Sequence, residues 1–168
     1  MALKFEFRWV VCALLFFATT VNYLDRQVLS LTWKDFIAPE FGWNDSHYGV
    51  ITGYFSLIYA VCMLFAGRIV DWLGTKKGYL WAIGVWSAAA CLHALCGKAT
   101  SLFAGVASVA SVSMWLFLGC RCLLALGEAG NFPAAIKATA EHFAPSDRAF
   151  ATSFFNSGSS VGAILAPE

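Results

Sequence analysis

Charged residues are scarce in this chain, and their scarcity argues against a soluble protein. Asp, Glu, Lys and Arg make up 12% of the 168 residues, whereas hydrophobic residues make up 60% and the mean hydropathy is +0.68. A soluble domain has about a quarter of its residues charged. The composition therefore predicts an all-α integral membrane protein. The few basic residues are scattered along the sequence, which argues against a nucleic-acid partner.

Several chemical signatures are also missing. The six cysteines have neither CxxC nor His-flanked spacing, so the sequence predicts no metal site and implies no disulfide framework. There is no HExxH motif and no recognisable nucleophile–base pair. We therefore expect a protein that is not an enzyme and that has no cofactor.

What the sequence does contain is a series of apolar stretches of helix length. The first continues past the length of a signal-peptide core, so we interpret it as a membrane span and not as a cleaved leader. Polar or Gly/Pro-containing turns separate the stretches, while the Gly97–Ser113 segment could be a loop, an extension of span three or the start of span four. We expect five spans, the last one truncated, at residues 8–31, 47–69, 79–95, 114–138 and 149–168.

The turn between the first two spans contains Pro39 and Gly42, which we interpret as helix breakers. Trp33 and Trp43 flank it, in the place where aromatic residues anchor a protein at the membrane interface. In the last span, Gly158 and Gly162 are four residues apart and predict close helix packing.

Lysine and arginine are unequally shared between the two ends of the predicted spans. One end has only Lys34 and Lys98, and basic residues near membrane spans are enriched on the cytoplasmic side. We therefore expect a cytoplasmic N-terminus. The basic end has seven residues: Lys4, Arg8, Arg68, Lys76, Lys77, Lys137 and Arg148.

Two of the spans carry charges where a lipid-facing helix should have none. Arg121 and Glu128 are seven residues apart, close to two helical turns, and so lie on one face of span four. Span one contains Asp25 and Arg26, whose side chains diverge by about 100°. An ionised group near the bilayer centre costs about 2.5–3.5 kcal/mol on insertion scales. These four groups should therefore face a partner or a hydrated cavity.

Two interpretations of the charges remain open. They can form a structural ion-pair network that links span one to span four, or they can line a substrate or ion pathway. If the pathway is correct, the arginines supply permanent positive charge and the two carboxylates can take up protons. Each proton bound would make the cavity more attractive to a carboxylate substrate, which predicts proton–anion coupling.

The residues and motifs resemble a known transporter family. GRIVDWLGTKK after span two is similar to the loop motif of the major facilitator superfamily, with Trp72 and Thr75 at positions where basic residues are common. NYLDRQVLS in span one, together with RCLLALGEAGNFPAAIKATAEHFAPSDRAF, resembles the anion:cation symporter branch and bacterial hexuronate transporters. The resemblance implies a twelve-helix fold of which this chain is most of the N-terminal half, with the C-terminal half absent.

The resemblance also implies roles for individual residues. Asp25 and Glu128 correspond to proton-binding carboxylates, and the arginines to groups that engage the substrate carboxylate or connect to the proton sites. The residues expected at the substrate are Tyr23, Arg26, Tyr59, Arg121 and, as a possible cavity residue of span five, Asn156. Those expected in the gating loop are Gly67, Asp71, Gly74, Lys76 and Lys77.

The sequence thus predicts a monomeric proton-coupled importer of hexuronates such as glucuronate or galacturonate, working by alternating access in the bacterial inner membrane. One alternative is a symporter of another organic anion, such as galactonate, another aldonate, a tartrate-like acid or phosphate. A second alternative is a multi-span scaffold that transports nothing.

Overall fold

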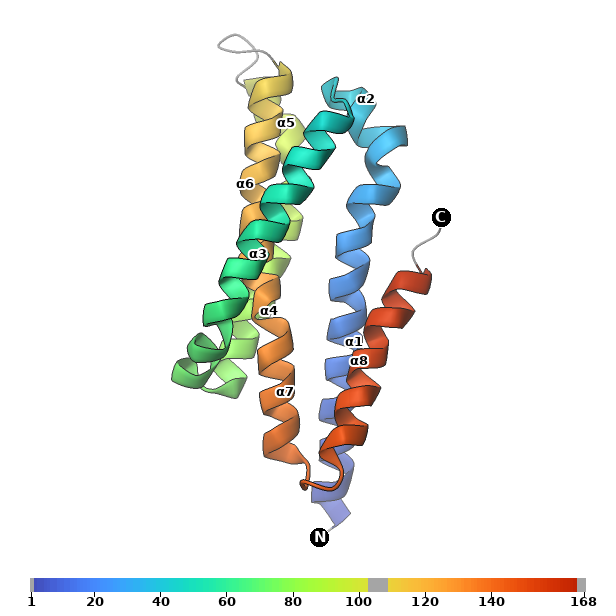
Figure 1. Ribbon diagram of the computed structural model, residues 1–168, viewed down its shortest axis with the longest axis vertical. Helices are drawn as coiled ribbons and strands as arrows, with labels where there is room; N and C mark the ends of the chain where they lie inside the picture. The colour runs from blue at the N-terminus through green and yellow to red at the C-terminus, as the bar shows by residue number, and fades with distance from the viewer. Residues whose placement is uncertain (1, 103–108, 166–168) are drawn as a thin grey trace.

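The structure is a computed structural model that describes residues 2–102 and 109–165, and within these residues it contains helices and no strand. The long helices form an elongated bundle (Figure 1). Their bounds are α1 Ala2–Thr32, α3 Asp45–Leu73, α4 Thr75–His93, α6 Val109–Ala129, α7 Asn131–His142 and α8 Arg148–Leu165. Two shorter helices, α2 Ala38–Phe41 and α5 Cys96–Leu102, lie at the end opposite the N-terminus (Figure 1).

Three stretches are long and apolar enough to cross a bilayer: Phe7–Phe41, Asp45–Leu73 and Ala110–His142. They correspond to the predicted spans one, two and four. The predicted third and fifth spans form α4 and α8, of 19 and 18 residues, which are about 27–29 Å long at 1.5 Å per residue. α8 packs along α1, and α3 and α4 pack along α6 (Figure 1).

The loop predicted after span one is wrong over most of its length. α1 continues through a π-helical turn, Trp33–Ile37, and then through α2. The N–H of Ala38 donates to the carbonyl of Trp33, five residues back, so the chain stays helical up to Pro39, which lies in the first turn of α2 where its missing N–H is tolerated. The helix ends at Gly42, whose φ of +66° is left-handed.

Trp33 and Trp43 are not interfacial anchors in this structure. Both are buried, and their rings stack with centroids 5.7 Å apart. The Trp43 indole N–H also donates to the carbonyl of Ala110. These two residues therefore belong to the core between the ends of α1, α3 and α6. The next helix, α3, begins at Asp45, and the side chain of Asn44 caps it.

The predicted fourth span is interrupted. α6 ends at Ala129 and α7 begins at Asn131, with Gly130 between them. Pro133 lies in the first turn of α7, where it cannot donate to the carbonyl four residues earlier, and this accounts for the break. Of the undecided 97–113 segment, residues up to 102 belong to α5, residues from 109 belong to α6, and residues 103–108 lie outside the described residues.

The close packing predicted for α8 is confirmed. A Cβ added at Gly158 would lie 2.6 Å from the backbone oxygen of Phe16, and one at Gly162 would lie 2.7 Å from that of Thr20. Both glycines are buried against α1. The α1–α8 pair is therefore closer than any larger residue at these two positions would permit.

Candidate functional site

An ion pair joins α1 to α6 in the interior of the bundle. Nε of Arg26 donates to Oε2 of Glu128 over 2.7 Å, and the Glu128 side chain is completely buried. The second carboxylate oxygen, Oε1, has no hydrogen-bond partner among the described residues. The charge of a carboxylate buried this deeply is stabilised by its arginine. The oxygen without a partner can bind a proton or accept a hydrogen bond from another donor.

Aromatic rings surround the guanidinium of Arg26. Its Cζ lies 4.3 Å from the ring centroid of Tyr59, 5.4 Å from that of Tyr23 and 5.8 Å from that of Phe55. Such rings attract a cation through their faces and keep water away from it. Tyr23 and Tyr59, both expected at the substrate site, therefore do lie beside Arg26.

Asp25 has a different hydrogen-bond partner from the adjacent Arg26. Its Oδ2 accepts a 2.6 Å hydrogen bond from the indole N–H of Trp86 on α4. The two adjacent residues therefore serve different partners, as their 100° separation predicts. A small residue permits this arrangement: a Cβ added at Gly127 of α6 would lie 2.5 Å from the backbone nitrogen of Trp86.

Arg121 connects the two carboxylates. Its side chain is buried, it interacts electrostatically with Glu128 and Asp25, and its Cζ lies 5.7 Å from the Phe55 ring. Nε of Arg121 has no hydrogen-bond partner among the described residues. Two arginines and two carboxylates thus form one group with no formal net charge, and part of its hydrogen-bonding capacity is unused.

Asp25, Arg26 and Arg121 of this group line two cavities. One, of about 140 Å³, lies between α1, α3 and α6 and is lined in part by Arg26, Arg121, Thr52 and Phe55. The other, of about 350 Å³, lies between α1, α4 and α6 and is lined in part by Asp25 and Arg121. Arg121 is the charged residue that lines both.

Most of the predicted site residues are therefore brought together, but Asn156 is not seen with them. Tyr23, Asp25 and Arg26 come from α1, Tyr59 from α3, and Arg121 and Glu128 from α6. Asn156 is exposed on α8, and its assignment to the substrate site stays a prediction.

Two residues of this site escaped the sequence analysis. Trp86 and Phe55 are aromatic residues in apolar helices, where they look like ordinary core residues. The only available signal was periodicity: Phe55 is four residues before Tyr59 and so shares its face of α3, and the two rings lie 6.1 Å apart. No comparable signal links Trp86 to Asp25, because their hydrogen bond depends on where the bundle places α4 relative to α1.

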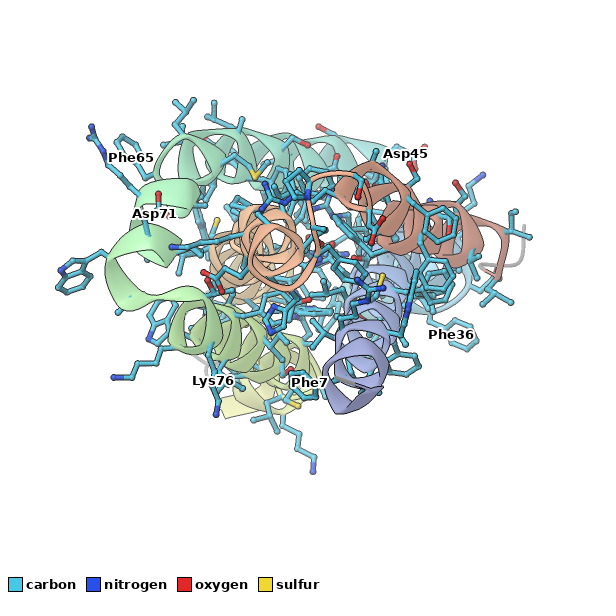
Figure 2. The ribbon with its side chains drawn as sticks, turned by 90° about the horizontal axis from the view of Figure 1, so that it is seen from below. Phe7, Phe36, Asp45, Phe65, Asp71 and Lys76 are labelled. Atoms are coloured by element: carbon cyan, nitrogen blue, oxygen red, sulfur yellow. The ribbon has the colours of Figure 1, made fainter. Side chains whose placement is uncertain are left out.

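The turn predicted for the gating loop is mostly helical, and only Gly74 lies between α3 and α4. Gly67 and Asp71 belong to the last turns of α3, and Lys76 and Lys77 to the first turn of α4. Asp71 and Lys76 are labelled in Figure 2. Gly74 connects the two helices with a φ of +81°, a conformation that favours glycine. Lys76 and Lys77 are exposed, and an added Cβ at Gly67 would meet nothing within 4 Å. A glycine is therefore required by backbone geometry at position 74 and not at position 67.

Contacts from this turn reach α7. Oδ1 of Asp71 accepts from Nζ of Lys137 over 2.7 Å, and the hydroxyl of Thr75 donates to Oε1 of Glu141 over 2.5 Å. The Asp71 side chain is 71% exposed, so this ion pair contributes little to stability. Its role is geometric: the ion pair joins α3 to α7, and the Thr75–Glu141 hydrogen bond joins α4 to α7 at the same end of the bundle.

Comparison with known proteins decides the family. The profile of the Major Facilitator Superfamily matches residues 15–167. The chain belongs to this superfamily. Its members are transporters and not enzymes, and the chain is accordingly part of a multi-pass membrane protein.

Curated relatives in the superfamily are named as sugar-acid transporters. The chain is 31% identical over 160 residues to the hexuronate transporter of Escherichia coli (strain K12), covering 95% of this chain and 33% of the relative. It is 29% identical over 161 residues to the galacturonate transporter of Dickeya chrysanthemi, covering 95% and 42%. The chain thus spans about a third to two fifths of the length of these relatives.

A solved structure has the same fold. The crystal structure of a bacterial homologue of the human lysosomal transporter Spinster, in an inward-facing and unoccupied conformation, superposes with a TM-score of 0.66 at 26% identity. The match covers 95% of this chain and 30% of the solved chain. The all-α membrane fold predicted from the sequence is confirmed.

Proposed function

We propose that this chain is part of a proton-coupled symporter that imports hexuronates across the bacterial inner membrane by alternating access. The observation that carries the proposal is an interior group of two arginines and two carboxylates in which Glu128 and Arg121 are buried and Asp25, Arg26 and Arg121 line two cavities. The names of the relatives, which transport hexuronates or galacturonate, support the substrate class.

The chemistry follows from charge balance. With Asp25 and Glu128 ionised, the group is neutral and attracts an anion weakly. When Glu128 takes up a proton, its ion pair with Arg26 is weakened, and the guanidinium becomes free to bind a substrate carboxylate. Release of the proton on the other side restores the ion pair and expels the anion. Proton and sugar acid then move in the same direction.

The small cavity beside Arg26 provides part of a sugar-acid site. Tyr48, Thr52 and Ser30 line it and offer hydroxyl groups suited to the hydroxyls of a sugar. Transporters of this type bind their substrate near the membrane midplane between two repeats. We propose that the rest of the site comes from the part of the fold that this chain does not cover.

The orientation of the proposed importer follows from the basic residues. The end of the bundle with Arg8, Lys76 and Lys137 faces the cytoplasm, and the end with α2 and α5 faces outward. An outward-open conformation would thus receive both proton and substrate from the α2–α5 end.

Uptake by the complete gene product in proteoliposomes tests this function. We expect an inward proton gradient to drive accumulation of radiolabelled glucuronate or galacturonate, and Arg121→Gln to weaken substrate affinity about ten- to a hundredfold, because a charged hydrogen bond is lost. A matched control is Arg68→Gln, an exposed arginine on α3. Accumulation of galactonate or tartrate in place of hexuronates would favour another anion, and a scaffold would accumulate none of them.

A further inference from the structure

We infer that the larger cavity is a proton access path to Asp25 that is separate from the substrate cavity. This inference rests on the proposed proton-coupled transport and specifies the path by which the proton reaches Asp25. Asp25 and Arg26 are neighbours in sequence, yet Asp25 lines the cavity between α1, α4 and α6, while Arg26 lines the cavity between α1, α3 and α6. Asp25 and Arg26 therefore line different cavities.

The larger cavity extends toward one end of the bundle. Besides Asp25, its lining includes Ile37, Glu40 and Phe41, from the continuation of α1 into α2, and Gly97 of α5. These short helices lie at the end opposite the N-terminus (Figure 1). Glu40 lines the cavity and is also exposed, so we take its carboxylate as the mouth of the cavity. It lies beside α5, since a Cβ added at Gly97 would be 3.3 Å from its Oε1.

Its size suits water, because about 350 Å³ is room for several molecules. Most of the lining is apolar, and the carboxylates of Glu40 at the mouth and Asp25 at the inner end offer hydrogen-bond acceptors. The charged and titratable side chains that line this cavity with Asp25 are Glu40, His93 and Arg121. A proton that enters beside Glu40 can pass along water to the carboxylate of Asp25, which becomes neutral, and the same proton leaves when the carboxylate ionises again.

Arg121 links the path to the substrate. It lines both cavities and interacts with Asp25 and Glu128, so neutralising Asp25 frees part of its charge for a substrate on the other side. Proton loading from one cavity would thus prepare the other cavity for an anion without the two ligands sharing an entrance.

The test compares net uptake with exchange in the complete protein. Ala94, an exposed residue of the cavity wall, is replaced by Phe to obstruct the path, and Glu40→Gln removes the charge at the mouth. We expect both variants to lower proton-driven net uptake toward the level of Asp25→Asn, while exchange of labelled for unlabelled substrate at equal pH is retained. Asp35→Asn, exposed on the preceding π-helical turn, is the matched control for Glu40. Thr52→Phe, in the smaller cavity, should abolish both activities.

The inference is overturned if Ala94→Phe keeps normal proton-driven uptake or loses exchange to the same extent. A second readout does not require proton coupling: labelling of Asp25 by a water-soluble carbodiimide, measured by mass spectrometry. We expect Ala94→Phe to block the labelling and a saturating sugar acid to leave it unchanged; protection by the substrate with no effect of the plug overturns the separate path. If the wild type shows no gradient-driven uptake at all, the proposed function fails, and the labelling still decides whether the cavity gives access to Asp25.

Discussion

At the scale of single residues, the burial of Glu128 makes its partner Arg26 indispensable. Removing one member of a buried ion pair leaves an uncompensated charge and costs about 3–5 kcal/mol, whereas removing both can be nearly neutral. We therefore expect Arg26→Gln to lower the unfolding temperature strongly and the double variant Arg26→Gln/Glu128→Gln to recover much of the loss. Tryptophan fluorescence during heating in detergent measures both.

The ion pair between Arg8 and Asp147 is the natural control for that experiment. Its N–O distance is 3.3 Å and the Asp147 side chain is 43% exposed. Exposed pairs contribute about 0–1 kcal/mol, so Asp147→Asn should change the unfolding temperature little. Equal losses for Asp147→Asn and Arg26→Gln would contradict the assignment of Arg26–Glu128 as a buried, mutually dependent pair.

Trp86 is predicted to stabilise the ionised form of the site through one hydrogen bond. Trp86→Phe keeps an aromatic ring in the core but removes the donor to Asp25, and a bond to a charged group is worth about 1.5–3 kcal/mol. We expect a matching loss in the free energy of unfolding, measured by chemical denaturation in mixed micelles. Trp81→Phe, exposed on the same helix, should be close to neutral, and a similar loss there would show that the hydrogen bond is not the cause.

At the scale of helices, the α1–α8 contact depends on two glycines. Gly158→Ala should push α8 from α1, because its Cβ would lie 2.6 Å from a backbone oxygen that cannot move alone. Gly53→Ala on α3 is the control, since nothing lies within 4 Å of a Cβ there and alanine favours a helix by about 1 kcal/mol over glycine. Opposite signs of the change in unfolding temperature are expected, and equal signs would count against close α1–α8 packing.

The sequence predicts which helices carry inward-facing charges, but it does not predict the partner of each charge. Hydropathy and spacing predicted that charges on spans one and four face inward, because an exposed charge in lipid is costly. They could not predict that Glu128 pairs with Arg26 while Asp25 bonds to Trp86, since helix rotation and packing decide those partners. Pro39 and Gly42 predicted a loop. In the structure a π-helical turn precedes Pro39, which lies in the first turn of α2, and only Gly42 ends the helix.

At the scale of the whole molecule, the α3–α4 turn, α7 and the α7–α8 turn meet at the proposed cytoplasmic end. Asp71 bonds to Lys137 there, and Arg8 of α1 bonds to Asp147 between α7 and α8. Large apolar side chains such as Phe36 and Phe65 point outward elsewhere on the bundle, as expected for surfaces that face lipid (Figure 2). Two of the three ion pairs among the described residues, Asp71–Lys137 and Arg8–Asp147, thus lie at this end of the bundle, where the proposed transporter can break and remake them.

This concentration predicts a defect in rate and not in stability when Asp71 is changed. Because the Asp71 side chain of this pair is 71% exposed, Asp71→Asn should alter the free energy of unfolding by less than about 1 kcal/mol. If the pair holds one end of the bundle closed during alternating access, the variant should lower the maximal uptake rate and leave the substrate KM nearly unchanged. Exchanging the charges, with Asp71→Lys and Lys137→Asp together, should restore part of the rate. A rate that stays normal in Asp71→Asn, or a charge exchange worse than either single change, would show that the ion pair has no part in gating.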